Sequence, residues 1–164
     1  MVSNLTNKIP HAELSEAALR FGFWKVSPIE VVLPESRLLL SWSGYVGRYS
    51  IGDHSYGYDY SQRVLAENGT IVAKLPPRQF GSHLYQAGSF EVASNLFFDV
   101  ASTLQRETTI RLGTEQQNEA VAYFDSSFYR WSFFSRQRKF YCQNGMSPLA
   151  TALAVATAID WAID

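Results

Sequence analysis

Residues 147–164, which read SPLATALAVATAIDWAID, decide the fold of this chain. Ser147 is a residue type preferred at the N-cap of a helix, and Pro148 suits the first helical turn. Alanine, the best helix former, recurs through the stretch, and nothing in it breaks a helix. Between Pro148 and Asp160 the only polar side chains are two threonines. We therefore predict a helix over residues 147–163 that is apolar on every side.

A helix without a polar face is either buried all round or placed in a membrane. The uninterrupted apolar run covers residues 146–159. A bilayer core requires about 20 such residues, so this run is too short to span it comfortably. We expect a helix buried at the centre of a soluble domain. The alternative is a tail anchor that keeps Arg136, Arg138 and Lys139 on the cytoplasmic side of the membrane.

The chain upstream of this helix reads as strands and turns. Residues 63–75 give the clearest pattern, because two β-like runs flank Asn68-Gly69, a pair typical of a type I′ hairpin turn. Other candidate strands recur about every ten residues with no helical crossover between them, which is typical of a barrel or sandwich. They are residues 29–33, 37–43, 83–86, 89–93, 97–102, 108–112, 119–124, 129–135 and 139–142. The expected class is mostly β (α+β), with a closed antiparallel sheet around the terminal helix.

The N-terminal residues are predicted to form a leader and a short helix. Apolar residues follow helical spacing over residues 11–21, and Gly22 suits the helix end. The expected organisation is a leader with this helix over 1–28 and one β-domain over 29–164. Residues 1–10 carry a single Lys8 and no apolar signal-peptide core, so we expect a cytoplasmic protein.

Composition narrows the function classes. A hydrophobic fraction of 46% with 18% charged residues is typical of a globular chain. Fourteen basic and fifteen acidic residues leave no basic excess, which argues against nucleic acid as the partner. The single cysteine, Cys142, excludes an intramolecular disulfide and a cysteine-based metal site, and it suits a reducing compartment.

The sequence predicts no catalytic residues, no metal site and no cofactor. The histidines His11, His54 and His83 form no pair at metal-ligand spacing. Asp53-His54-Ser55 contains the residue types of a hydrolytic triad, but neighbouring strand residues point to opposite faces. Cys142 is interpreted as a small core residue. We therefore expect a protein that is not an enzyme.

Two clusters are candidates for binding. Arg130, Arg136, Arg138 and Lys139 lie near the end of the predicted sheet and suit lipid phosphates or an acidic partner. Arg136 and Arg138 are expected on one strand face and Lys139 on the other. The alternative is a solvated turn.

The second cluster is a row of tyrosines, Tyr56, Tyr58 and Tyr60, which share one face of a strand. An exposed row stacks bases or sugars. A buried row packs across strands or lines the interior, and the sequence favours this second interpretation.

Three segments resemble the tubby C-terminal-like superfamily, which includes tubby domains, phospholipid scramblases and the plant LURP-one-related proteins. They are the helix and aspartate over 148–160, the hairpin over 64–75, and Trp131-Ser132-Phe133-Phe134. The resemblance implies a closed barrel of about twelve strands around the C-terminal helix, spanning roughly residues 29–142. Residues 141–147 contain no carboxylate, so the calcium-binding segment of scramblases has no counterpart here.

The resemblance implies a non-catalytic binding or scaffold module. Its partner would be an anionic membrane surface, engaged through acidic lipid head groups, or a protein; the oligomeric state stays open. The alternative is a lipocalin-like carrier or enzyme, with the terminal helix outside and a small apolar ligand inside the barrel. A third possibility is an interaction subunit whose aromatic surface is covered only in a complex.

Overall fold

The computed structural model describes residues 14–22, 27–75, 88–92, 96–102, 108–113, 118–129 and 135–163. These ranges are mostly β, with a long C-terminal helix, α2 (Pro148–Ile163), and a single-turn helix, α1 (Ser126–Tyr129). The strands are β1 (Ser15–Phe21), β2 (Pro28–Val32), β3 (Arg37–Leu39), β4 (Ser41–Ser43), β5 (Val46–Ile51), β6 (His54–Asp59), β7 (Val64–Glu67), β8 (Thr70–Lys74), β9 (Gly88–Val92), β10 (Leu96–Ser102), β11 (Thr108–Gly113), β12 (Asn118–Phe124) and β13 (Gln137–Cys142).

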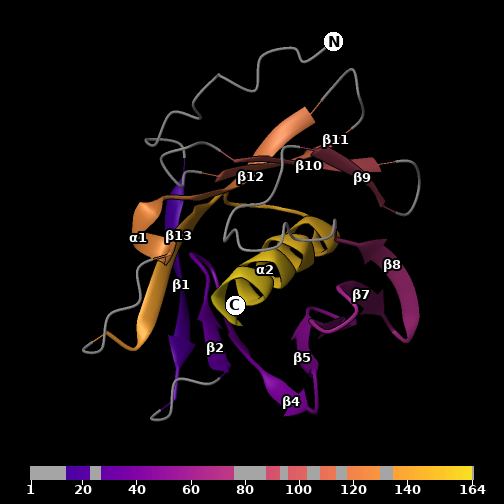
Figure 1. Cartoon of the computed structure of the whole chain (residues 1–164), viewed down its shortest axis with the longest axis vertical. Helices are drawn as coiled ribbons and strands as arrows, with labels where there is room; N and C mark the ends of the chain where they lie inside the picture. Colours follow the sequence, from indigo (N-terminus) through magenta and orange to yellow (C-terminus); the bar gives the residue numbers. More distant parts are fainter. Residues whose placement is uncertain are drawn as a thin grey trace.

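The strands form one antiparallel sheet that folds over α2. Its order is β3-β2-β1-β13-β12-β11-β10-β9-β8-β7-β6-β5-β4, so nearly every strand pairs with its neighbour in sequence. The order departs from this pattern at two places, because β1 pairs with β13 through six residues of each strand and β3 does not pair with β4. Figure 1 shows α2 between β1, β2 and β13 on one side and β5, β7 and β8 on the other. The arrangement is sandwich-like, with a helix as the filling.

The prediction of a closed barrel is wrong. The sheet is open, because its order ends at β3 on one side and β4 on the other, and these two strands do not pair with each other in the described ranges. Leu40 joins them, and there the chain leaves β2 to pair with β5. We call this break between β3 and β4 the seam. It is bridged by a backbone bond from Leu40 N–H to Ile29 O (2.9 Å) and by the Trp42 indole N–H, which donates to Pro28 O (2.6 Å).

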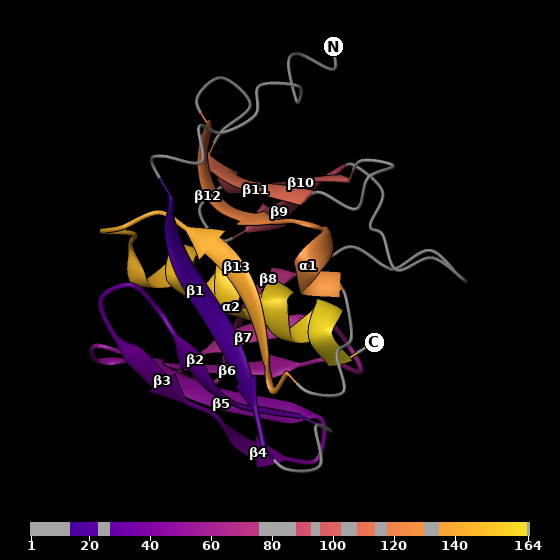
Figure 2. The ribbon, with the colours of Figure 1, turned by 90° about the vertical axis from the view of Figure 1, so that its left-hand side faces the viewer.

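The predicted C-terminal helix is confirmed, and so is its burial. Every residue of α2 from Ala150 to Ala162 is buried, although the helix has no conventional apolar stripe. Its small side chains allow strands to approach on all sides, and β2, β5, β6 and β12 all contact it. Figure 2 shows β1 and β13 crossing in front of the helix. Apolar burial of this extent is the main driving force for a sheet that wraps one helix.

The predicted N-terminal helix is wrong, because residues 15–21 form β1, an interior strand of the sheet between β2 and β13. Ala17, Leu19 and Phe21 alternate inward and are buried against the interior. The same short run satisfies helical and strand spacing, and pairing with β2 and β13 on both sides favours the strand. The leader therefore contributes a core strand.

The predicted hairpin is confirmed as β7 and β8. Asn68 and Gly69 have φ angles of 49° and 86°, which are the positive values that a type I′ turn needs. The strands expected over 29–33, 37–43, 89–93, 97–102, 108–112, 119–124 and 139–142 are present, with a break at Leu40. The strand expected over 83–86 lies outside the described residues. Of the strand expected over 129–135, Tyr129 is the last residue of α1 and residues 130–134 lie outside the described residues.

Candidate functional site

The predicted basic cluster does not form one surface patch. Arg138 is only 8% exposed and lies on the inner face of β13. Its guanidinium is 5.7 Å from the ring centroid of Phe21 and 6.0 Å from that of Phe128, which is cation–π geometry. Burial lowers the pKa of Arg138. A lipid head group outside the sheet does not reach this side chain.

The other members of the cluster are placed differently. Lys139 is exposed on the opposite face of β13, and its Nζ is 3.3 Å from Oε1 of Glu16 on β1. Arg136 is exposed just before β13, and its carbonyl accepts a bond from Phe21 N–H. Arg130 lies outside the described residues. Arg136 and Arg138 therefore differ in exposure, contrary to the expectation that they share a face.

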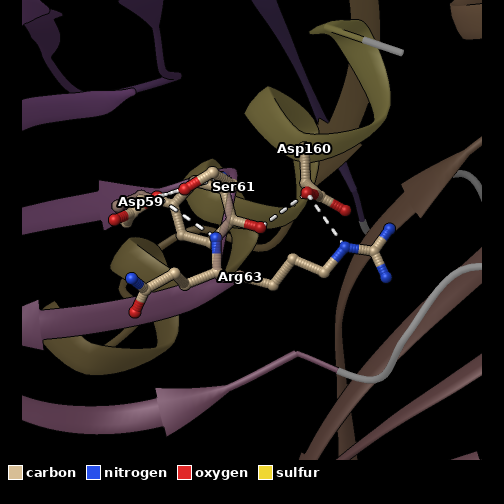
Figure 3. Close-up of polar contacts among 6 residues, drawn as sticks. Asp59, Ser61, Arg63 and Asp160 are labelled. Atoms are coloured by element: carbon tan, nitrogen blue, oxygen red, sulfur yellow. Dashed lines mark hydrogen bonds and ion pairs between the residues drawn. The ribbon is translucent and has the colours of Figure 1, made fainter. Parts of the chain in front are cut away.

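A buried polar contact among Asp160, Tyr58 and Arg63 holds the C-terminal end of α2. We call this end of the helix the anchored end. Asp160 is fully buried and accepts a hydrogen bond from the Tyr58 hydroxyl at 2.6 Å. The Arg63 guanidinium Nε is 3.8 Å from the same carboxylate oxygen, and Figure 3 shows the Asp160 and Arg63 side chains directed toward each other. A buried carboxylate needs such partners, because desolvation of an unpaired charge costs several kcal/mol.

The turn before β7 delivers Arg63 to this contact. Arg63 has a φ of 58°, a left-handed conformation that strains a non-glycine residue. The turn is held by Asp59, whose Oδ1 accepts hydrogen bonds from Ser61 and from the Gln62 N–H. Figure 3 shows these bonds beside the ion pair. Burial raises the pKa of Asp59, but its hydrogen bonds outweigh this effect and the net pKa is lowered.

The tyrosine row is part of the interior, as the sequence favoured. Tyr56 and Tyr58 are almost fully buried, and Tyr60 packs against the core at a partly buried position. Tyr49 on β5 adds a further bond, since its hydroxyl donates to the Ala152 carbonyl of α2 at 2.7 Å. Burial raises the pKa of Tyr49 well above its usual value. The Tyr49 and Tyr58 hydroxyls bond the sheet to the helix, and the buried Tyr56 and Tyr58 rings are not free to stack a ligand.

The N-terminal end of α2 borders a cavity of about 130 Å³. We call it the mouth pocket. It is formed by the turn between β2 and β3, the end of β5, the loop that joins β13 to α2, and the first turns of α2. Its lining residues are Leu33, Pro34, Glu35, Ser36, Ile51, Cys142, Gln143, Asn144, Gly145, Met146 and Thr151.

The mouth pocket is not a nucleophilic site. Cys142 is 1% exposed, in agreement with its interpretation as a core residue. Burial, and secondly the charge of Glu35, raise the pKa of the Cys142 thiol to about 11. The thiol is therefore protonated at neutral pH, whereas the thiolate is the reactive form. The pocket can hold a molecule by contact but does not attack one through this thiol.

Within the described ranges, His54 pairs with a carboxylate and not with a nucleophile or a metal ligand set. Its Nδ1 is 2.8 Å from Oε1 of Glu67, which also accepts a bond from the Tyr56 hydroxyl at 2.7 Å. His54 lies on β6 and Glu67 on β7, so the pair joins two neighbouring strands. In the described part of the chain, His, Cys, Asp and Glu side chains form no group of three or more that could hold a metal ion.

Among the residues whose exposure is described, four large apolar side chains are exposed, and three of them lie on the strands and turn that flank the seam. Leu39 on β3 is 77% exposed, and Tyr45 in the β4–β5 turn and Ile29 on β2 are more than half exposed. The Tyr45 ring packs edge-on against Tyr60, with ring centroids 5.3 Å apart. Behind them the Trp42 ring lies against Gly47, where an added Cβ would be 2.9 Å from the indole. The fourth such side chain, Ile71, is on β8, away from the seam.

Comparisons of the chain with family models, with curated proteins and with solved structures gave no match. The resemblance to the tubby superfamily therefore stays a prediction. Among the described residues, no helix is both long enough and apolar enough to cross a membrane.

Sequence reasoning missed Asp160, Arg63 and the mouth pocket. For Asp160 a signal was present, since a carboxylate in an otherwise apolar helix requires a buried partner. The partner itself has no signature in sequence, because the conformation of Arg63 depends on the turn that precedes it. The mouth pocket has none either, because its lining comes from segments about 100 residues apart.

Proposed function

We propose that this protein is a non-catalytic binding or scaffold module, of the kind that the tubby resemblance implies, and that it docks a protein partner at the seam. The observation that carries the proposal is the position of α2. The helix occupies the interior where a lipocalin would hold its ligand, so partners of any size must bind outside.

A protein partner is favoured over a lipid surface by the distribution of charge and apolar area. Of the basic residues expected to meet lipid phosphates, Arg138 lies in the interior and Lys139 forms an ion pair with Glu16. Leu39, Tyr45 and Ile29 are instead large exposed apolar side chains at one break in the sheet. Exposed apolar groups that gather in this way are typical of protein interaction sites. A cytoplasmic setting is part of the same proposal, and peripheral contact to a membrane is the alternative that vesicle flotation tests.

Site-specific photo-crosslinking in the native cell tests this function. A photoreactive phenylalanine analogue is placed at position 39 and, as a matched control, at position 71, which is similarly exposed but distant from the seam. We expect one discrete crosslinked protein species from position 39 and none from position 71. A second variant, Leu39→Glu with the reporter at position 45, should abolish the product. The same products from both positions, or none from either, would contradict docking at the seam.

Vesicle flotation separates the lipid alternative from this proposal. The purified chain is mixed with neutral vesicles and with vesicles that contain phosphatidylserine, over a salt series. We expect no binding to either. Binding to anionic vesicles alone that fades with added salt would favour acidic lipid head groups as the partner instead.

A further inference from the structure

We propose that the mouth pocket is a binding site for a small organic cation, with its ammonium group on the Glu35 carboxylate and its apolar body against Leu33, Ile51 and Met146. The site is separate from the seam, and the proposal does not depend on a protein partner docking there. It assigns to the chain a small-molecule ligand held at the N-terminal end of the helix rather than inside the sheet.

The charges around the pocket favour a cation. Glu35 is the only charged residue among its lining residues, none of which is basic. Glu35 lines the pocket together with Cys142, and its charge contributes to the raised pKa of that thiol. Ser36, Gln143 and Asn144 add neutral hydrogen-bonding groups. An anion would meet the Glu35 carboxylate without a compensating positive side chain.

A helix N-terminus usually attracts anions through its free N–H groups, but here most of these groups are occupied. Pro148 has no N–H, the Ala150 N–H donates to Ser147 Oγ at 3.2 Å, and the Thr151 N–H donates to the Ser147 carbonyl at 3.0 Å. The Thr151 hydroxyl also donates to that carbonyl. The helix end that borders the pocket therefore has few donors left for an anion.

The size and lining of the pocket limit the uncharged part of the ligand to a small apolar group. A volume of about 130 Å³ is close to the ~150 Å³ of an engineered apolar cavity that holds benzene. Leu33 is buried, whereas Ile51 and Met146 are partly buried and provide apolar surface near the opening. A single ring or a short aliphatic chain fits this space, with the charged group toward the exposed Glu35. The protonated thiol of Cys142 makes the binding non-covalent.

Titration with three ligands of the same shape tests the proposal. Benzylamine, benzyl alcohol and benzoate are added to the full chain at pH 7, and binding is followed by two-dimensional amide NMR. We expect saturable shifts at Ser36, Asn144 and Gly145 with benzylamine, with a Kd of about 1 mM, as befits a ligand of this size. Benzyl alcohol should bind about two- to fivefold more weakly, the range for a partly exposed ion pair, and benzoate more weakly still.

Two variants distinguish the charge effect from simple filling of a cavity. Glu35→Gln should reduce benzylamine affinity to that of benzyl alcohol, and because Glu35 is exposed the variant is expected to fold. Glu30→Gln, which changes a carboxylate that pairs with Arg20 on β1, is the matched control and should leave the affinity unchanged. Equal binding of all three ligands, no loss in Glu35→Gln, or no saturable shift with benzylamine would each overturn the proposal.

Discussion

The two ends of α2 are held in different ways. At the C-terminal end, a fully buried carboxylate contacts a tyrosine hydroxyl from β6 and an arginine from the following turn. At the N-terminal end, the helix is capped locally by Ser147, and the surrounding loops leave a cavity of about 130 Å³. The anchored end joins segments about 100 residues apart, whereas the cap joins residues three apart.

This difference explains which end of α2 can bind a ligand without destabilising the fold. A buried charge is strongly destabilising once a partner is lost, so the residues of the anchored end are committed to the fold. At the mouth pocket the helix is packed less completely, but the polar groups that line the pocket are hydrogen-bonded to nearby residues or face solvent. A ligand can therefore bind at this end without disrupting the contacts that fix the helix in the sheet.

The largest effect expected from the comparison is at Asp160. Asp160→Ala leaves Tyr58 and Arg63 facing an apolar gap, and we expect a loss of about 3–5 kcal/mol in the free energy of unfolding. Asp160→Asn keeps an acceptor for the tyrosine and should cost about 1–3 kcal/mol. Ser147→Ala, at the other end, removes an N-cap and should cost about 1 kcal/mol. Urea denaturation gives all three values, and an Asp160→Ala variant no less stable than Ser147→Ala would contradict the comparison.

A smaller effect is expected where a ring packs beside the anchored end. Gly47 pairs with Tyr58 in the ladder, and an added Cβ there would be 2.9 Å from the Trp42 ring. Gly47→Ala should cost about 1–3 kcal/mol, because the indole must move and its bond to Pro28 is strained. Gly57→Ala on the next strand is the matched control, since its Cβ would be 3.4 Å from Val46. Thermal denaturation should separate the two variants, and equal melting temperatures would argue against close packing of Trp42.

The smallest effect is expected at the mouth pocket and depends on pH. The pKa of Cys142 rises from the ordinary 9.0 to about 11 on folding. Between these values the folded chain keeps a proton that the unfolded chain releases, so stability is full below pH 9 and falls as the pH rises toward 11. From pH 9 to pH 10 the loss should be about 1 kcal/mol. Cys142→Ala should lack this component in denaturation at the two pH values. An identical pH dependence in both proteins would show that the thiol is not buried.

Parts of the fold follow from local sequence and parts do not. The terminal helix could be predicted because its composition admits no other structure, and the β7–β8 hairpin because Asn68-Gly69 specifies its turn. β1 could not, since Ala17 and Phe21 satisfy helical spacing while Ala17, Leu19 and Phe21 satisfy strand spacing. Only pairing with β13, more than 100 residues away, decides between them.

The candidate sites were less predictable than the fold. Arg138 and Lys139 are adjacent in sequence, and the pleat of β13 alone places one inside and the other outside. The seam depends on where the chain changes its pairing partner at Leu40, which is a property of the whole sheet. The prediction of a closed barrel rested on the tubby resemblance, because neither edge of a sheet can be seen in the sequence of its strands.

Amide hydrogen exchange of the full chain tests most directly whether α2 is the core around which the sheet folds. We expect the amides from Leu153 to Trp161 to be among the slowest in the protein and to exchange only through global unfolding, with faster exchange at the first turn beside the mouth pocket. If the whole of α2 instead exchanged well before β1, β5 and β13, the helix would not be the core, and the central claim would be wrong.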